Sequence, residues 1–136
     1  MINGINHLTF AVRDLAASVA FYRDVLEMRL VARWPKGAYL LAGDLWVALI
    51  VDGATRAEPL PEYTHAAFDV RPADFARVAE RIRASGATVW KENRSEGASL
   101  YFLDPSGHKL EIHATDLSAR LAHAKSDPWD GLEIYE

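Results

Sequence analysis

The sequence predicts an α+β protein built from two similar β-α-β-β-β modules. Short segments of alternating hydrophobicity predict strands, and one segment of helical spacing interrupts them in each half. The same order of segments occurs twice, which indicates a duplication. The length of 136 residues suits one domain, and no stretch approaches the roughly 20 apolar residues of a membrane span.

The first module is expected over residues 1–52. It begins with a strand at 5–12, in which His7 and Thr9 face away from an apolar face. Asp14 is a typical helix N-cap. The helix that follows has an apolar stripe of Leu15, Val19, Tyr22 and Leu26. Three further strands are predicted at residues 29–34, 38–42 and 45–51.

The second module is expected over residues 63–113, after a linker at 53–62 that is rich in proline and glycine. Its first strand, 63–70, again carries a histidine, His65, on the face opposite the apolar residues. Pro72 is suited to the first turn of a helix, and Gly86 is suited to its end. The remaining strands are predicted at 87–91, 99–103 and 109–113. The C-terminal helix and tail, 114–136, begin with a helix from Asp116 to about Ala124.

Composition excludes several classes of function. The chain has no cysteine, so it forms no disulfide, thiolate metal site or cysteine nucleophile. Its net charge of −4 argues against nucleic acid as a partner. No signal peptide or membrane segment is recognisable, so we expect a cytoplasmic protein without a membrane partner.

A metal site is indicated by His7, His65 and Glu111. The two histidines occupy matching positions of the repeats, so pseudo-symmetry would aim both rings into one cavity. Glu111 lies between apolar neighbours in a core strand, where a carboxylate is unfavourable unless it is paired or bound to metal. An ion pair with Lys or Arg remains an equal alternative. A His-His-Glu set leaves open positions and suits Mn(II), Fe(II), Zn(II) or Ni(II). We expect His108, His113 and His123 to tolerate substitution better.

An anion site is indicated by Lys91, Arg94 and Arg120, because an anionic substrate needs local positive charge on an acidic protein. The nearby loop at 93–99 is rich in small polar residues that could bend toward an ion. An ordinary solvated turn is the alternative for that loop.

Several motifs together resemble the fosfomycin-inactivating glutathione transferases, a branch of the vicinal-oxygen-chelate (glyoxalase/bleomycin resistance) superfamily. The resemblance covers almost the full chain. Its motifs include Asn6-His7-Leu8-Thr9, Tyr63-Thr64-His65, Trp90-Lys91, Asn93-Arg94-Ser95-Glu96-Gly97 and Gly107-His108-Lys109-Leu110-Glu111. The Asn93-Arg94-Ser95-Glu96-Gly97 loop, together with Trp90-Lys91 before it, is the motif most specific to this branch.

The resemblance implies paired βαβββ modules in a homodimer that exchanges modules. Each metal site would combine His7 of one chain with His65 and Glu111 of the other, and would bind Mn(II). It implies a potassium ion held by Asn93, Ser95, Gly97 and Ser99. It also implies contacts between the fosfomycin phosphonate and Thr9, Lys91, Ser95, Tyr101 and Arg120, of which Thr9, Lys91, Tyr101 and Arg120 would be catalytic. The neighbouring cavity, where thiol and oxirane meet, would be lined by Trp34, Tyr39 and Trp46.

Glutathione is the favoured nucleophile for opening the epoxide. Relatives that use bacillithiol or cysteine carry Cys at the position of Thr9. Relatives that hydrolyse fosfomycin have an acidic base on the strand before the linker, where residues 45–49 have none. Fosfomycin hydrolysis and drug sequestration remain the alternatives. Ala66 and Trp129 depart from the family pattern on the glutathione side.

Overall fold

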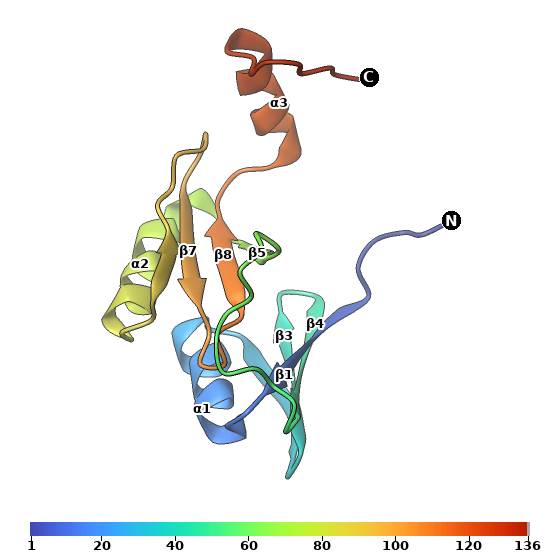
Figure 1. Ribbon diagram of the computed structural model, residues 1–136, viewed down its shortest axis with the longest axis vertical. Helices are drawn as coiled ribbons and strands as arrows, with labels where there is room; N and C mark the ends of the chain where they lie inside the picture. Colours follow the sequence, from blue (N-terminus) through green and yellow to red (C-terminus); the bar gives the residue numbers. More distant parts are fainter. Residues whose placement is uncertain (136) are drawn as a thin grey trace.

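The computed structural model describes residues 1–135 and contains two four-stranded sheets, one from each half of the chain (Figure 1). The first sheet has the strand order β1-β4-β3-β2. Strand β1 is parallel to β4, and the other pairs are antiparallel. Its strands are β1 (His7–Val12), β2 (Arg29–Trp34), β3 (Gly37–Ala42) and β4 (Leu45–Val51).

The second sheet repeats this topology in the order β5-β8-β7-β6, with β5 parallel to β8. Helix α2 (Pro72–Ala84) lies along one face of it and begins at the predicted proline (Figure 1). The strands are β5 (Ala66–Asp69), β6 (Val89–Lys91), β7 (Ser99–Leu103) and β8 (Lys109–His113). The predicted fold class, with its repeated β-α-β-β-β order, is therefore confirmed.

The helix of the first module departs from regular α-helical spacing. It consists of α1 (Leu15–Ala20), capped by the Asp14 side chain, and a π-helical turn, η1 (Phe21–Val25). Phe21 and Tyr22, at the start of the π turn, are both buried. The apolar stripe predicted from sequence contains Tyr22 but not Phe21.

Three strands are shorter than predicted, because the pairing of two strands stops where one of them turns away. Strand β1 begins at His7 rather than residue 5, since its partner β4 begins just after the turn at Gly43. Strand β5 begins at Ala66, opposite Leu110, so His65 precedes the strand. Strand β6 begins at Val89 rather than at residue 87.

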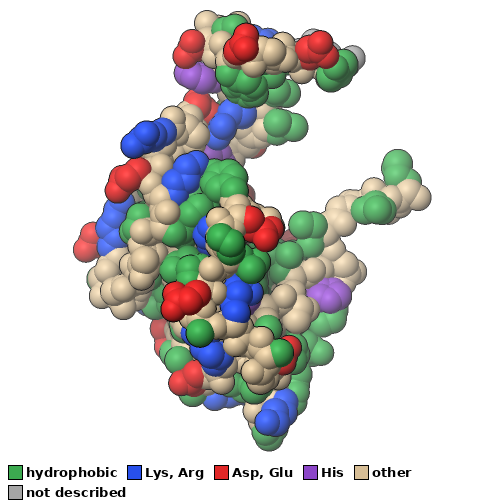
Figure 2. All heavy atoms as spheres, in the orientation of Figure 1, with side chains coloured by type: hydrophobic (Ala, Val, Ile, Leu, Met, Phe, Trp, Pro, Cys, Tyr) green, Lys and Arg blue, Asp and Glu red, His purple; other side chains and the backbone are tan. Residues whose placement is uncertain are grey.

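Both ends of the chain stand away from the main body (Figure 2). The first six residues form an arm without helix or strand, and α3 (Leu117–Ser126) projects beyond the second sheet (Figure 1). Several apolar side chains on these segments are exposed, including Ile2, Ile5, Leu117 and Trp129. Within residues 1–135 no helix combines the length and apolar character needed to cross a bilayer.

The two modules share one hydrophobic core, and specific hydrogen bonds join them. The Tyr22 hydroxyl donates to Oδ2 of Asp104 over 2.7 Å, between η1 and the β7–β8 turn. His108 Nε2 lies 2.7 Å from the carbonyl oxygen of Ala11. The Arg13 guanidinium donates to the carbonyl oxygens of Pro105 and Ser106. These bonds fix one sheet relative to the other.

We predict that Tyr22→Phe destabilises the protein by about 1–3 kcal/mol, the usual cost of leaving a buried partner without its hydrogen bond. Asp104 keeps the amide donors of Ser106 and His108 at Oδ1 but loses the only donor that contacts Oδ2 within residues 1–135. Urea unfolding at neutral pH measures the change. Tyr135→Phe, on an exposed residue, should change stability by about 0.5 kcal/mol or less.

Alkaline unfolding tests the same contact. Burial, reinforced by the Asp104 carboxylate, raises the pKa of Tyr22 well above its ordinary value. In the unfolded chain the phenol ionises near pH 10, whereas in the folded protein it keeps its proton. Stability should therefore fall as the pH rises above about 10. Tyr22→Phe should lose this component, and an unchanged alkaline slope in the variant would contradict it.

Candidate metal and substrate site

The centre of the candidate site is the carboxylate of Glu111 on β8, which is only 6% exposed. Its neighbours Leu110 and Ile112 point into the core, so Glu111 lies on the opposite face of the sheet, as predicted. Oε1 is 2.9 Å from Nε2 of His65, and Oε2 accepts a 2.7 Å hydrogen bond from the Ser99 hydroxyl. Its partners are thus histidine and serine, and the ion pair with Lys or Arg that the sequence left open is not what holds it.

The His65 ring is oriented as a metal ligand would be. Its Nδ1 lies 2.7 Å from the carbonyl oxygen of Tyr63, which can only accept, so Nδ1 carries the proton. Nε2, on the other side of the ring, is directed at the Glu111 carboxylate. Two electron-rich atoms at this distance need a cation or a second proton between them. Their 2.9 Å separation suits two donors that each lie about 2.1 Å from one ion.

A cationic and aromatic group adjoins this pair. Lys91 Nζ donates to the Tyr63 hydroxyl over 2.6 Å and lies 4.7 Å from the centre of the Tyr101 ring. The hydrogen bond to Tyr63 raises the pKa of Lys91, so its ammonium stays charged at neutral pH. The His65 and Tyr101 rings are 5.9 Å apart. Lys91 and Tyr101 pair across β6 and β7, and Tyr101 pairs with Glu111, so all three share a face.

The loop at 93–99 is closed by the side chain of Asn93. Its amide donates to the carbonyl oxygen of Gly97, and its oxygen accepts from both the amide and the hydroxyl of Ser95. Ser99 begins β7 beyond the loop and is buried. Asn93, Ser95 and Gly97 are therefore brought together, whereas the Ser99 hydroxyl contacts Glu111 and His113.

Arg120 reaches the same loop from α3. Its Nε lies 3.6 Å from Oε2 of Glu96, and Nη2 is 3.5 Å from the Glu96 carbonyl oxygen. Within residues 1–135 the buried Nε has no hydrogen-bond partner. Its unused donors remain suited to an anion.

A second group of predicted residues lies on the first sheet. The His7 ring stacks on Trp46, with 4.3 Å between centroids, and Trp46 packs against Tyr39. Thr9 is exposed on the same face, because it follows His7 by two positions along β1. Trp34 extends this aromatic row beside Tyr39.

The two groups do not form one complete metal site within a chain. Across residues 1–135 no cluster of three or more histidine, aspartate or glutamate side chains could hold an ion. His65 and Glu111 are in contact, whereas the contacts of the His7 ring are with Asn6 and Trp46.

The structure adds His113, Tyr63 and Trp90 to the residues predicted from sequence. His113 lies 2.5 Å from the Ser99 hydroxyl, and Tyr63 holds both His65 and Lys91. Trp90 packs on His65 and donates to the Leu110 carbonyl oxygen. Alternation along β8 could have indicated His113, because it follows Glu111 by two positions.

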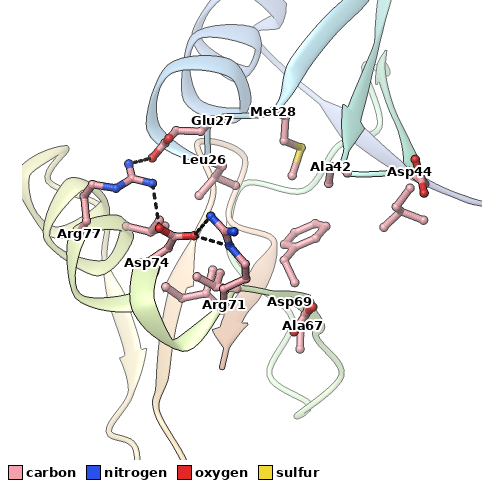
Figure 3. A pocket seen from close by; sticks show the side chains of 16 residues that line it. Leu26, Glu27, Met28, Ala42, Asp44, Ala67, Asp69, Arg71, Asp74 and Arg77 are labelled. Atoms are coloured by element: carbon pink, nitrogen blue, oxygen red, sulfur yellow. Dashed lines mark hydrogen bonds and ion pairs between the residues drawn. The ribbon is translucent and has the colours of Figure 1, made fainter. Parts of the chain in front are cut away.

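A cavity of about 600 Å³ lies apart from these residues (Figure 3). It is lined by both modules, from Met28, the β3–β4 turn, β5 and the start of α2. The charged side chains at its rim largely form ion pairs with each other, since Arg77 pairs with Glu27 and Asp74. None of the site residues predicted from sequence lines it.

Comparison with known proteins gives consistent relatives along nearly the whole chain. The chain is 51% identical over 134 residues to the glutathione transferase FosA of Serratia marcescens, covering 97% of this chain and 95% of that protein. It is 37% identical to the metallothiol transferase FosB of Shouchella clausii, covering 90% and 88%.

Solved structures agree with this similarity. The fosfomycin resistance protein FosX of Mesorhizobium loti is 37% identical, with a TM-score of 0.74, covering 89% of this chain and 99% of that one. A Listeria monocytogenes FosX variant in complex with Mn(II) and 1S,2S-dihydroxypropylphosphonic acid is 30% identical, with a TM-score of 0.77, covering 90% and 98%. The family model of the glyoxalase/bleomycin resistance protein/dioxygenase superfamily matches residues 4–112. The chain belongs to that superfamily.

Proposed function

We propose that this protein is a metal-dependent glutathione transferase that opens the epoxide ring of fosfomycin and so confers resistance, in the cytoplasm. One observation carries the proposal: Nε2 of His65 and the Glu111 carboxylate converge beside the charged Lys91 ammonium. This combination suits an anionic substrate that must also contact a divalent cation. The similarity to FosA of Serratia marcescens, a glutathione transferase, supports the choice of thiol.

The metal would be held by His65 and Glu111 of one chain and the partner's His7. We propose Mn(II), which is present in the related FosX complex. A divalent ion in this position supplies a Lewis acid for the oxygen that becomes negatively charged as the epoxide opens. The stacked Trp46 ring and Asn6 hold the His7 imidazole at the start of β1, on an exposed face that a second copy could complete.

The phosphonate dianion would be bound by the cationic and hydroxyl groups around the metal pair. Lys91 is kept charged, and Tyr101 lies directly beside it. Ser95, Arg120 and, from the first sheet, Thr9 complete this proposed set. A potassium ion held by Asn93, Ser95, Gly97 and Ser99 would add positive charge beside the phosphonate.

The nucleophile would be the glutathione thiolate, which attacks a ring carbon from the side opposite the departing oxygen. A sulfur–carbon bond forms as the carbon–oxygen bond breaks, and the alkoxide then takes up a proton. Trp34, Tyr39 and Trp46 would line the cavity in which this happens. Strand β4 carries no carboxylate to act as a base for water, which favours thiol addition over hydrolysis.

The separation of the two groups of site residues supports a homodimer. An exchanged pair of modules would place His7 of each chain opposite His65 and Glu111 of the other. The exposed edges of β1 and β5, which each pair with one strand only, are available for this contact.

The reaction product tests the activity. We predict that incubation with fosfomycin, glutathione and Mn(II) gives a one-to-one fosfomycin–glutathione adduct in mass spectrometry, and that a chelator abolishes turnover. A fosfomycin–water adduct would indicate hydrolysis instead. Stoichiometric protection that persists in chelator would indicate sequestration.

Substitution of the proposed ligands tests the metal site and whether two chains contribute to it. We predict that His7→Ala, His65→Ala and Glu111→Ala each abolish turnover and most Mn(II) binding, whereas His123→Ala on α3 changes neither. Co-refolding His7→Ala with Glu111→Ala should restore about a quarter of the wild-type activity, because half of the dimers are mixed and each of these has one intact site. A site built within one chain would leave the mixture inactive.

Exchange of the monovalent cation tests the loop. We predict that replacing K⁺ by Na⁺ at constant ionic strength lowers turnover, because the smaller ion fits a cage of hydroxyl and carbonyl oxygens less well. Asn93→Ala, which opens the loop, should reduce this difference. A rate that is equal in K⁺ and Na⁺ would mean that the loop is an ordinary turn.

A further inference from the structure

We propose that His113 is a positioning residue for Glu111, acting through Ser99 with Thr115 behind it. These residues form a relay of hydrogen bonds that holds one oxygen of the carboxylate and so presents the other to the metal. The inference rests on the proposed metal site. It concerns residues beyond the expected ligand set.

The relay is continuous and shielded from solvent. Thr115 Oγ1 lies 2.6 Å from His113 Nε2, and His113 Nδ1 lies 2.5 Å from Ser99 Oγ. Ser99 Oγ lies 2.7 Å from Glu111 Oε2, whereas His113 Nδ1 is 3.4 Å from the same oxygen, so the path through Ser99 has the shorter contacts. Ser99 and Glu111 are buried, and about a fifth of the His113 side chain is exposed. Each of these hydrogen bonds is short, and water has little access to the buried bond between Ser99 and Glu111.

The direction of the two inner links follows from the carboxylate. An ionised carboxylate only accepts, so the Ser99 hydroxyl donates its one hydrogen to Glu111. Ser99 can then only accept from His113, so Nδ1 of His113 carries a proton. Nε2 of His113 faces the Thr115 hydroxyl, which can either donate or accept. The donors of Ser99 and His113 thus point toward Glu111, and Ser99 keeps one lone pair for another partner.

The backbone places these groups in register. Ser99 and His113 face each other across β7 and β8, and the Ala114 amide donates to the Ala98 carbonyl oxygen just beyond them. Gly97 packs directly on Thr115: a Cβ at this glycine would lie 2.7 Å from Thr115 Cγ2. Its φ of +83° is also one that few other residues adopt. The loop at 93–99 therefore supports the far end of the relay.

The consequence concerns Glu111 itself. With Oε2 held by Ser99, the carboxylate cannot rotate freely, and Oε1 stays directed at His65 Nε2. Groups that orient a metal ligand typically contribute about 10–100-fold to metal affinity. This differs from the expectation, based on sequence alone, that His113 tolerates substitution.

The test measures Mn(II) affinity of the full-length protein without substrate, from the electron paramagnetic resonance signal of free Mn(II). We predict that His113→Ala weakens binding about 10–100-fold. His113→Asn should recover most of the affinity, since its amide N–H can replace Nδ1–H as the donor to Ser99. His123→Ala, a histidine outside the relay, should bind as the wild type does. Wild-type affinity in His113→Ala, or no recovery in a folded His113→Asn, would overturn the inference.

A double-variant cycle separates a relay from independent effects. Because His113 acts through Ser99, His113→Ala combined with Ser99→Ala should bind Mn(II) no more weakly than Ser99→Ala alone. Losses that multiply would contradict the relay. Binding without formation of a glutathione adduct would refute the proposed reaction but leave the relay standing. A wild-type protein that binds no Mn(II) would overturn the relay.

Discussion

Burial of the Glu111 carboxylate is the constraint on which the site depends. A charged group in a nearly dry environment is strongly unfavourable unless other groups compensate it. Ser99 donates to one of its oxygens, and the other faces Nε2 of His65. A proton or a cation between these two atoms compensates the carboxylate, and in the proposed site a bound cation would also attract an anionic substrate.

The fold creates this environment through two features. Alternation along β8 places Leu110 and Ile112 in the core and Glu111 on the open face of the sheet, together with Tyr101 and Lys91 on the neighbouring strands. The modules are then fixed to each other on the opposite side, by bonds such as that between Tyr22 and Asp104. The open faces of both sheets remain free of helices, so site residues gather there rather than in the shared core.

The residues of the proposed site are divided between the two modules. The aromatic row that ends at His7 lies on the first sheet, whereas the cationic and carboxylate groups lie on the second. In the proposed dimer each chain would supply half of two sites, so metal binding and association would reinforce each other.

The sequence by itself determined the repeated β-α-β-β-β order, the face on which His7 and Glu111 lie, and the start of α2 at Pro72. These depend on local periodicity and capping, which neighbouring residues encode. Only the tertiary structure decided that the helix of the first module ends in a π turn, that His65 precedes β5, and that Glu111 is held by Ser99 and His65 rather than by Lys or Arg. Such features depend on strand register and on contacts between residues far apart in the chain, and hydrophobic spacing carries no information about either.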